Sequence, residues 1–113
     1  MSAVPALLAA SEPGVRELYD DLLRMAGQCG PFEVEEKKTS LHLVRKSAFV
    51  GVHPRKKHLV VTLKAAGPVS SARIFKSEQV SKSRWHHEVK LASAADVDTE
   101  LLVWMREAYE ISA

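Results

Sequence analysis

The sequence predicts an α+β fold in which a single antiparallel sheet of about five to six strands packs against an N-terminal and a C-terminal helix. Segments near both ends of the chain repeat apolar residues at helical spacing, whereas the segments between them alternate apolar and polar residues as half-buried strands do. Short turn-forming stretches separate the alternating segments, which favours antiparallel pairing of neighbours.

The length of the chain is that of a single domain. A chain of 113 residues can bury a core of its own. We expect one domain over 1–113, with an N-terminal arm at 1–11, a helix at 12–29, the antiparallel sheet within 32–91 and a second helix at 94–111. No apolar run approaches the roughly 20 residues of a membrane span, and the apolar start lacks the basic residues of a signal peptide. We therefore expect a cytoplasmic protein that does not enter a membrane.

Capping residues and breakers define the two helices. Ser11 is a suitable N-cap for the first helix, and Gly30-Pro31 ends it. The stretch Ser93–Asp96 resembles a capping box before the second helix. The apolar stripes that we expect to be buried are Val15, Leu18, Tyr19, Leu22, Met25, Ala26 and Cys29 in the first helix, and Val97, Leu101, Trp104, Met105, Ala108 and Ile111 in the second.

Residues 41–64 predict the centre of the sheet. A four-residue turn at Pro54–Lys57 would place Val52 opposite Leu59 and His53 opposite His58. A turn at Lys46-Ser47 would place the preceding strand in register, with Leu43 facing Val50 and Leu41 facing Val52, so that three strands turn their apolar side chains to one side. His42, Gly51, Val60, Thr62 and Phe49 would then lie on the outer face.

The outer strands follow the same alternation. A first, edge-like strand is predicted over 32–36, a short strand over 73–76 and a further strand over 84–91. The stretch 78–83 is predicted to be a polar loop. In the last strand Trp85, His87, Val89 and Leu91 would share the apolar face.

Charge is distributed unevenly. Residues 37–90 carry a net charge of +11 and the flanking segments carry −9, although the whole chain carries only +2. The hairpin tip supplies three adjacent cations, and we expect further basic residues on the same surface. The predicted anion-binding residues are Lys38, Arg45, Lys46, Arg55, Lys56, Lys57 and Arg84. Alternatively, basic strands and acidic helices neutralise each other, and the lysines keep the sheet edge from aggregating.

The five histidines allow two further hypotheses. His53 and His58, if opposite each other, could share a metal ion, but the ligand spacings of known metal sites are absent, so we expect no metal and no cofactor. His87 is the weak candidate for a catalytic residue, as a general base beside Trp85 with Glu78 or Glu88 as its orienting carboxylate. The alternative for His87 is a neutral core histidine that hydrogen-bonds to the backbone, a serine or a tyrosine.

Several short stretches together resemble a known family. They are Gly30-Pro31, Lys38-Thr39, Phe49 followed by Pro54 and Leu59, the run Trp85–Leu91, Asp96-Val97-Asp98, Leu101, Trp104 and Glu107-Ala108-Tyr109. This set resembles the bacterial domain of unknown function 5655, some members of which carry the label "predicted transport protein". The resemblance implies a small bacterial domain and assigns no catalytic residue.

The residues support three hypotheses of function. The first is a non-enzymatic binding module for an anionic macromolecule, possibly nucleic acid held through its backbone phosphates. The second is a structural or regulatory domain that docks on a protein or forms a homodimer through the outer face of Phe49, Val60 and Thr62. The third is a small enzyme that uses His87 in a cleft.

Overall fold

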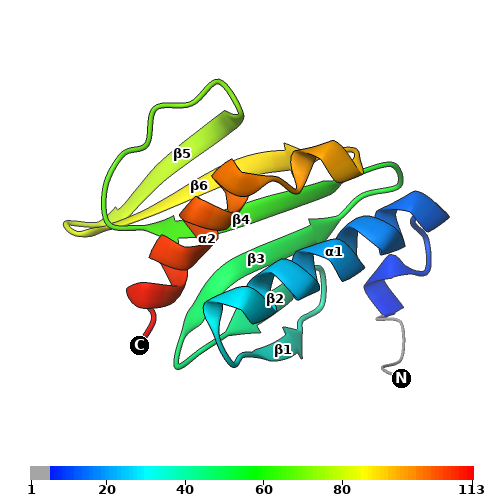
Figure 1. The fold of residues 1–113 in the computed structure, drawn as a ribbon, viewed down its shortest axis with the longest axis horizontal. Coiled ribbons are helices and arrows are strands. Elements are labelled where there is room, and N and C mark those ends of the chain that lie inside the picture. Colours follow the sequence, from blue (N-terminus) through cyan, green and yellow to red (C-terminus); the bar gives the residue numbers. More distant parts are fainter. Residues whose placement is uncertain (1–5) are drawn as a thin grey trace.

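The computed structural model describes residues 6–113, in which two helices lie over one face of a six-stranded antiparallel sheet (Figure 1). This confirms the predicted α+β fold; residues 1–5 of the predicted arm lie outside the described residues. The helical elements are η1 (Ala6–Leu8), α1 (Pro13–Cys29), η2 (Ala94–Asp96) and α2 (Thr99–Glu110). The strands are β1 (Glu33–Glu36), β2 (Leu41–Val44), β3 (Ala48–Pro54), β4 (Leu59–Ala65), β5 (Ile74–Ser81) and β6 (Arg84–Leu91). No helix in this part of the chain is long and apolar enough to cross a membrane.

The strand order departs from the chain order at one place. Neighbours in the sheet follow the order β1-β2-β3-β4-β6-β5, so the chain passes from β4 to the far edge, forms β5 and returns as β6 beside β4. Figure 1 shows β5 at the outer edge of the sheet, with β6 between it and β4. This order brings the side chains of β6 next to those of β4.

The core lies between the sheet and the helices. Of the predicted α1 stripe, Cys29 is only partly buried, and the buried residues are Val15, Leu18, Tyr19, Leu22, Met25 and Ala26. Of the predicted second stripe, Leu101, Met105 and Ala108 are buried, whereas Val97, Trp104 and Ile111 are only partly buried; Tyr109, which was not predicted, is buried as well. The strands contribute Leu41, Leu43, Phe49, Val50, Val52, Leu59, Val61, Leu63, Val89 and Leu91. Apolar burial of this kind is the main favourable term in folding.

The hairpin of β3 and β4 has a different register from the predicted one. Val52 pairs with Val61 and His53 with Val60, so the predicted pairs of Val52 with Leu59 and of His53 with His58 are wrong. The turn lies one residue later, at Arg55–His58, where the Arg55 amide donates to the His58 carbonyl at 2.9 Å. A shift of two residues by itself leaves the β4 side chains on their predicted faces, because the period of a strand is two. The predicted pairing of Leu43 with Val50 and of Leu41 with Val52 is confirmed.

Phe49 lies in the core and not on the outer face. The pairing of β2 with β3 passes from Leu43–Val50 to Val44–Ala48, which leaves Phe49 as the extra residue of a bulge. Its ring is 1% exposed and packs edge-on against Tyr109 of α2, with 5.1 Å between centroids. Period-two alternation cannot predict this burial, because the bulge interrupts the period.

Three predicted local features also need correction. Glu12, not Ser11, precedes α1 as its N-cap, and the Ser11 hydroxyl instead donates to the Arg55 carbonyl at 2.7 Å. The predicted helix over 94–111 is divided: the capping box of Ser93 and Asp96 closes η2 alone, and Asp98 caps α2. The predicted polar loop over 78–83 is wrong, because β5 continues to Ser81.

Candidate functional site

The face of the sheet opposite the helices carries a group of polar side chains that surround one hollow. Alternate residues of β2, β3, β4 and β6 lie on this open face, and β5 adds one more. They surround a hollow of about 260 Å³ that we call the open-face hollow. Its polar lining consists of His42, His53, Thr62, Lys64, Glu78, His86 and Glu88.

Gly51 makes room for the hollow at the middle of β3. A Cβ atom built on Gly51 would lie 3.5 Å from Thr62 Cβ and 3.8 Å from His53 Nε2, which is ordinary van der Waals contact. The backbone of Gly51 has a negative φ, so its conformation does not require glycine. A variant with a side chain at this position should therefore fold normally, and that side chain would occupy the hollow.

Two imidazoles lie at the end of the hollow nearer the β3–β4 turn. Partial burial, and then the Arg55 guanidinium and His42, lower the pKa of His53, while Glu88 opposes this shift. His53 therefore takes up its proton at a lower pH than a free histidine does. His42 Nε2 lies 3.1 Å from Ser40 Oγ.

The other end of the hollow is cationic and lies near the β2–β3 turn. Lys64 donates to Ser47 Oγ at 2.8 Å. Partial burial, and then the nearby Arg84 guanidinium, lower the pKa of Lys64. Glu88 on the neighbouring strand forms an ion pair with Lys76, whose Nζ lies 3.6 Å from the carboxylate. The hollow thus presents imidazole, hydroxyl and ammonium groups together with two carboxylates.

The predicted anion-binding residues divide into two groups at opposite ends of β3. Arg55, Lys56 and Lys57 form the β3–β4 turn, and Lys38 belongs to the β1–β2 loop at the same end, since Leu41 pairs with Val52. The second group consists of Arg45 and Lys46 in the β2–β3 turn and of Arg84 at the start of β6, beside the β5–β6 turn. They do not form the single tip-centred surface that was predicted, and none of them lines the open-face hollow. Lys57 instead lines a hollow beside α1, together with Glu12, Glu17 and Asp21.

Two of these cations stabilise the C-terminal end of α2. Arg45 donates to the Tyr109 carbonyl at 3.0 Å and lies over the Tyr109 ring at 4.2 Å from its centroid. Arg84 donates to the Ile111 carbonyl at 3.1 Å. Cations at this end complement the helix dipole and satisfy carbonyls that have no partner inside the helix. Arg45 and Arg84 therefore have structural contacts that the sequence did not reveal.

His87 is 2% exposed and has partners on both ring nitrogens. Its Nε2 lies 2.9 Å from the Gly67 carbonyl and its Nδ1 lies 2.8 Å from Ser77 Oγ. A carbonyl only accepts, so Nε2 carries a proton, and the serine hydroxyl is the hydrogen-bond partner of Nδ1. The space beside the ring is about 10 Å³, and Glu88 lies on the opposite face of the strand. This geometry is that of a buried histidine that ties β5 and the loop after β4 to the core.

The two candidate metal ligands are not paired. His53 faces Val60, and His58 closes the turn through its backbone carbonyl. Within residues 6–113 no three histidine, cysteine or carboxylate side chains are grouped so as to hold a metal ion.

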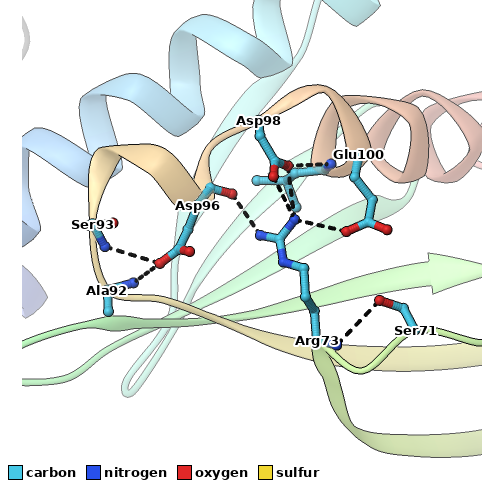
Figure 2. Close-up of polar contacts among 8 residues, drawn as sticks. Ser71, Arg73, Ala92, Ser93, Asp96, Asp98 and Glu100 are labelled. Carbon is cyan, nitrogen blue, oxygen red and sulfur yellow. Dashed lines mark hydrogen bonds and ion pairs between the residues drawn. The ribbon is translucent and has the colours of Figure 1, made fainter.

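Arg73 organises a polar cluster that the sequence analysis missed (Figure 2). Its guanidinium donates to Asp98 at 2.8 Å, to Glu100 at 3.1 Å and to the Asp96 carbonyl at 2.7 Å. Although desolvation opposes it, hydrogen bonds from the Leu101 amide and from Arg73 hold the pKa of Asp98 below its ordinary value. The cluster joins the start of β5 to the start of α2. In the sequence, only the acidic residues within 96–100 indicated this cluster.

The comparisons with known proteins give one match. The sequence model of a domain of unknown function, DUF5655, matches residues 6–112. No curated protein and no solved structure matches the chain.

Proposed function

The chain belongs to the DUF5655 family, a domain of unknown function, and we propose from its own geometry that it is a binding module for an anionic partner that crosses the open face of the sheet. The partner that this surface suits best is a nucleic acid strand held through its backbone phosphates. The proposal depends chiefly on one observation: the open-face hollow brings Lys64, Thr62 and three imidazoles to one surface of the sheet, and basic turns lie beyond both ends of β3.

The size of the surface suits a short stretch of an extended anion. The seven residues of β3 span roughly 23 Å at about 3.3 Å per residue, which separates the two basic ends. Lys56 and Lys57 are exposed at one end, and Lys64 lies toward the other. Between them Thr62 and the imidazoles offer hydrogen-bond donors to phosphate oxygens.

The lining of the hollow favours phosphate contacts over base recognition. Phe49 is the only phenyl or indole ring among its lining residues, and that ring is 1% exposed, so bases have no aromatic platform on which to stack. The carboxylates of Glu78 and Glu88 limit the number of phosphates that the hollow tolerates. We therefore expect weak binding with little sequence preference and about two to three phosphate contacts.

Fluorescence anisotropy with labelled single-stranded DNA and RNA and with a DNA duplex, each measured over a salt series, tests this proposal. The double variant Lys56→Glu/Lys57→Glu and the single variant Lys64→Glu should each weaken binding about tenfold or more and reduce the salt dependence. The matched control is Arg16→Glu/Arg106→Glu, which makes the same change in charge on exposed positions of α1 and α2. The control should bind as the wild type does, apart from the small effect of net charge.

Two outcomes would contradict the proposal. One is the absence of salt-dependent binding to every strand tested, and the other is an equal loss in the control and in the open-face variants. Inorganic polyphosphate and a mononucleotide serve as competitors that identify the source of the phosphate. If polyphosphate displaced the nucleic acid and the mononucleotide did not, the anion-binding site would stand, but its partner would be polyphosphate and not nucleic acid.

A further inference from the structure

We propose that two copies of this chain associate edge to edge through β5, in antiparallel register centred on Ser77, and so form a continuous sheet of twelve strands. The proposal concerns a surface outside the open-face hollow and does not depend on the binding of an anion. It starts from the contrast between the two free edges of the sheet, which are β1 and β5.

The β5 edge is long and its residues are exposed, and in Figure 1 the connection from β4 to β5 runs along its outer side. Seven of its eight residues are exposed and none is buried, and Figure 1 shows it at the outer margin of the sheet, beyond the helices that cover the core. Phe75 is 58% exposed and Val80 is 45% exposed, which makes them two of the four large apolar side chains on the surface of the described residues. An edge strand carries unpaired amide and carbonyl groups, so it is a template for another strand.

The β1 edge is unsuited to the same contact with a second copy. It has only four residues, and three of them are Glu33, Glu35 and Glu36. Two copies of this strand in antiparallel pairing would bring these glutamates together, and like charges on paired strands repel. Of the two edges, β5 alone has a balanced charge, with Lys76 and Glu78 on either side of Ser77.

Symmetry and charge together select the register. In a two-fold symmetric antiparallel pair one residue must lie opposite its own copy, because paired residues point to the same face. A centre at Lys76 would place two lysines opposite each other, and a centre at Glu78 would place two glutamates opposite each other. A centre at Ser77 places Lys76 opposite Glu78 of the second copy, twice in each dimer.

The orientation of the side chains agrees with this register. Lys76 contacts Glu88 and Glu78 lines the open-face hollow, so both lie on the open face, whereas Ser77 contacts His87 on the helix side. Irregularities beside Phe75 and Val80 leave Lys76–Gln79 as the regular segment. Such a short interface predicts a weak dimer, with a Kd of roughly 10 to 1,000 μM.

Sedimentation equilibrium over a protein concentration of roughly 10 μM to 1 mM measures the association. The wild type should change reversibly from monomer to dimer. Lys76→Glu alone and Glu78→Lys alone each place like charges opposite each other twice, and each should weaken self-association about tenfold or more. An equimolar mixture of these two variants should form a heterodimer, because both charged pairs are then complementary again.

Hydrogen exchange of the wild type gives a second measurement that needs no substitution. Backbone amides of β5 that point away from β6 should exchange more slowly at high protein concentration than at low concentration, while amides of β1 should not change.

A monomer at every concentration would overturn the proposal, as would a dimer that both single variants leave intact. A heterodimer no tighter than the two variants alone, or assembly into species larger than a dimer, would also overturn it, since open-ended growth indicates a contact between different edges. None of these measurements contains an anionic ligand, so their failure would leave the proposed function untouched.

Discussion

The two faces of the sheet are made from alternate residues of the same strands, yet they have different compositions. On the helix side Leu41, Val52, Val61 and Val89 are fully buried, whereas on the open side the same strands present His42, His53, Thr62 and Glu88, all partly exposed. Burial on the helix side provides the stability, so the open side is free to carry polar groups that have little part in folding. Substitutions on the first face should change stability, and those on the second face should change binding.

Phe49 and Gly51 provide the strongest test of this difference, because they lie on one strand. We expect Phe49→Ala to lower the free energy of unfolding by about 3–5 kcal/mol, since it removes a buried ring between Phe32 and Tyr109. Gly51→Ala should change the free energy of unfolding by less than about 1 kcal/mol, because its Cβ would make ordinary contacts. Urea denaturation measures both. Equal losses in the two variants would show that the open face also determines stability.

Gly30 tests how closely the two helices fit on the covered side. Its φ of 145° is a conformation that other residues rarely adopt, and an added Cβ would overlap the Tyr109 ring, whose hydroxyl donates to the Pro31 carbonyl at 2.8 Å. We expect Gly30→Ala to cost about 1–3 kcal/mol or more in thermal unfolding. The control is Gly27→Ala within α1, where a Cβ meets nothing within 4 Å. The control should stabilise the protein by about 0.5–1 kcal/mol, and a loss there as large as at Gly30 would contradict this explanation.

The covered face was predicted well because its signal is local. The alternation over Leu41–Leu63 and the helical spacing of Leu18, Leu22 and Met25 each indicate the buried side without knowledge of the partner. The register error at Val52 left the face assignment intact, because a shift of two residues preserves alternation. Phe49 was misplaced because the bulge that turns it inward is a property of the pairing between two strands.

The open-face hollow could not be predicted as a unit. His42, His53 and Thr62 were expected on the outer face, but the sequence does not show that β6 inserts beside β4 and brings His86 and Glu88 to them. The basic residues were grouped by their closeness in sequence, whereas β3 separates Arg55 from Lys46 by its whole length. Strand order depends on long-range packing, which a single sequence records only weakly.

His86 and His87 give a smaller but more selective test, because adjacent residues of β6 point to opposite faces. His87→Phe should lower the free energy of unfolding by about 1–3 kcal/mol, since it leaves the Gly67 carbonyl and the Ser77 hydroxyl without their ring partner. His86→Phe should change stability by no more than about 0.5 kcal/mol but weaken the binding of an anionic strand. Chemical denaturation and anisotropy, each applied to both variants, measure this separation. The opposite pattern, a binding defect confined to His87→Phe, would favour a role for His87 beyond structure.

The pH dependence of His53 is the smallest effect, and its sign distinguishes the free protein from the bound one. Burial, followed by Arg55 and His42, lowers the pKa of His53 in the folded chain, against the influence of Glu88. As the pH falls below about 6.5, the unfolded chain takes up this proton first, so the free energy of unfolding of the unliganded protein should decrease. A bound phosphate would stabilise the protonated imidazole and oppose this loss.

An oligonucleotide should therefore raise the midpoint of thermal unfolding more at about pH 5.5 than at about pH 7.5. The variant His53→Asn should reduce that difference, because the imidazole that titrates inside the hollow is gone. The variant His58→Asn makes the same change at the hairpin, outside the hollow lining, and should retain most of the difference. If His53→Asn kept the full difference and His58→Asn lost it, the anion would bind at the hairpin tip, and the polar side of the sheet would not be the binding surface.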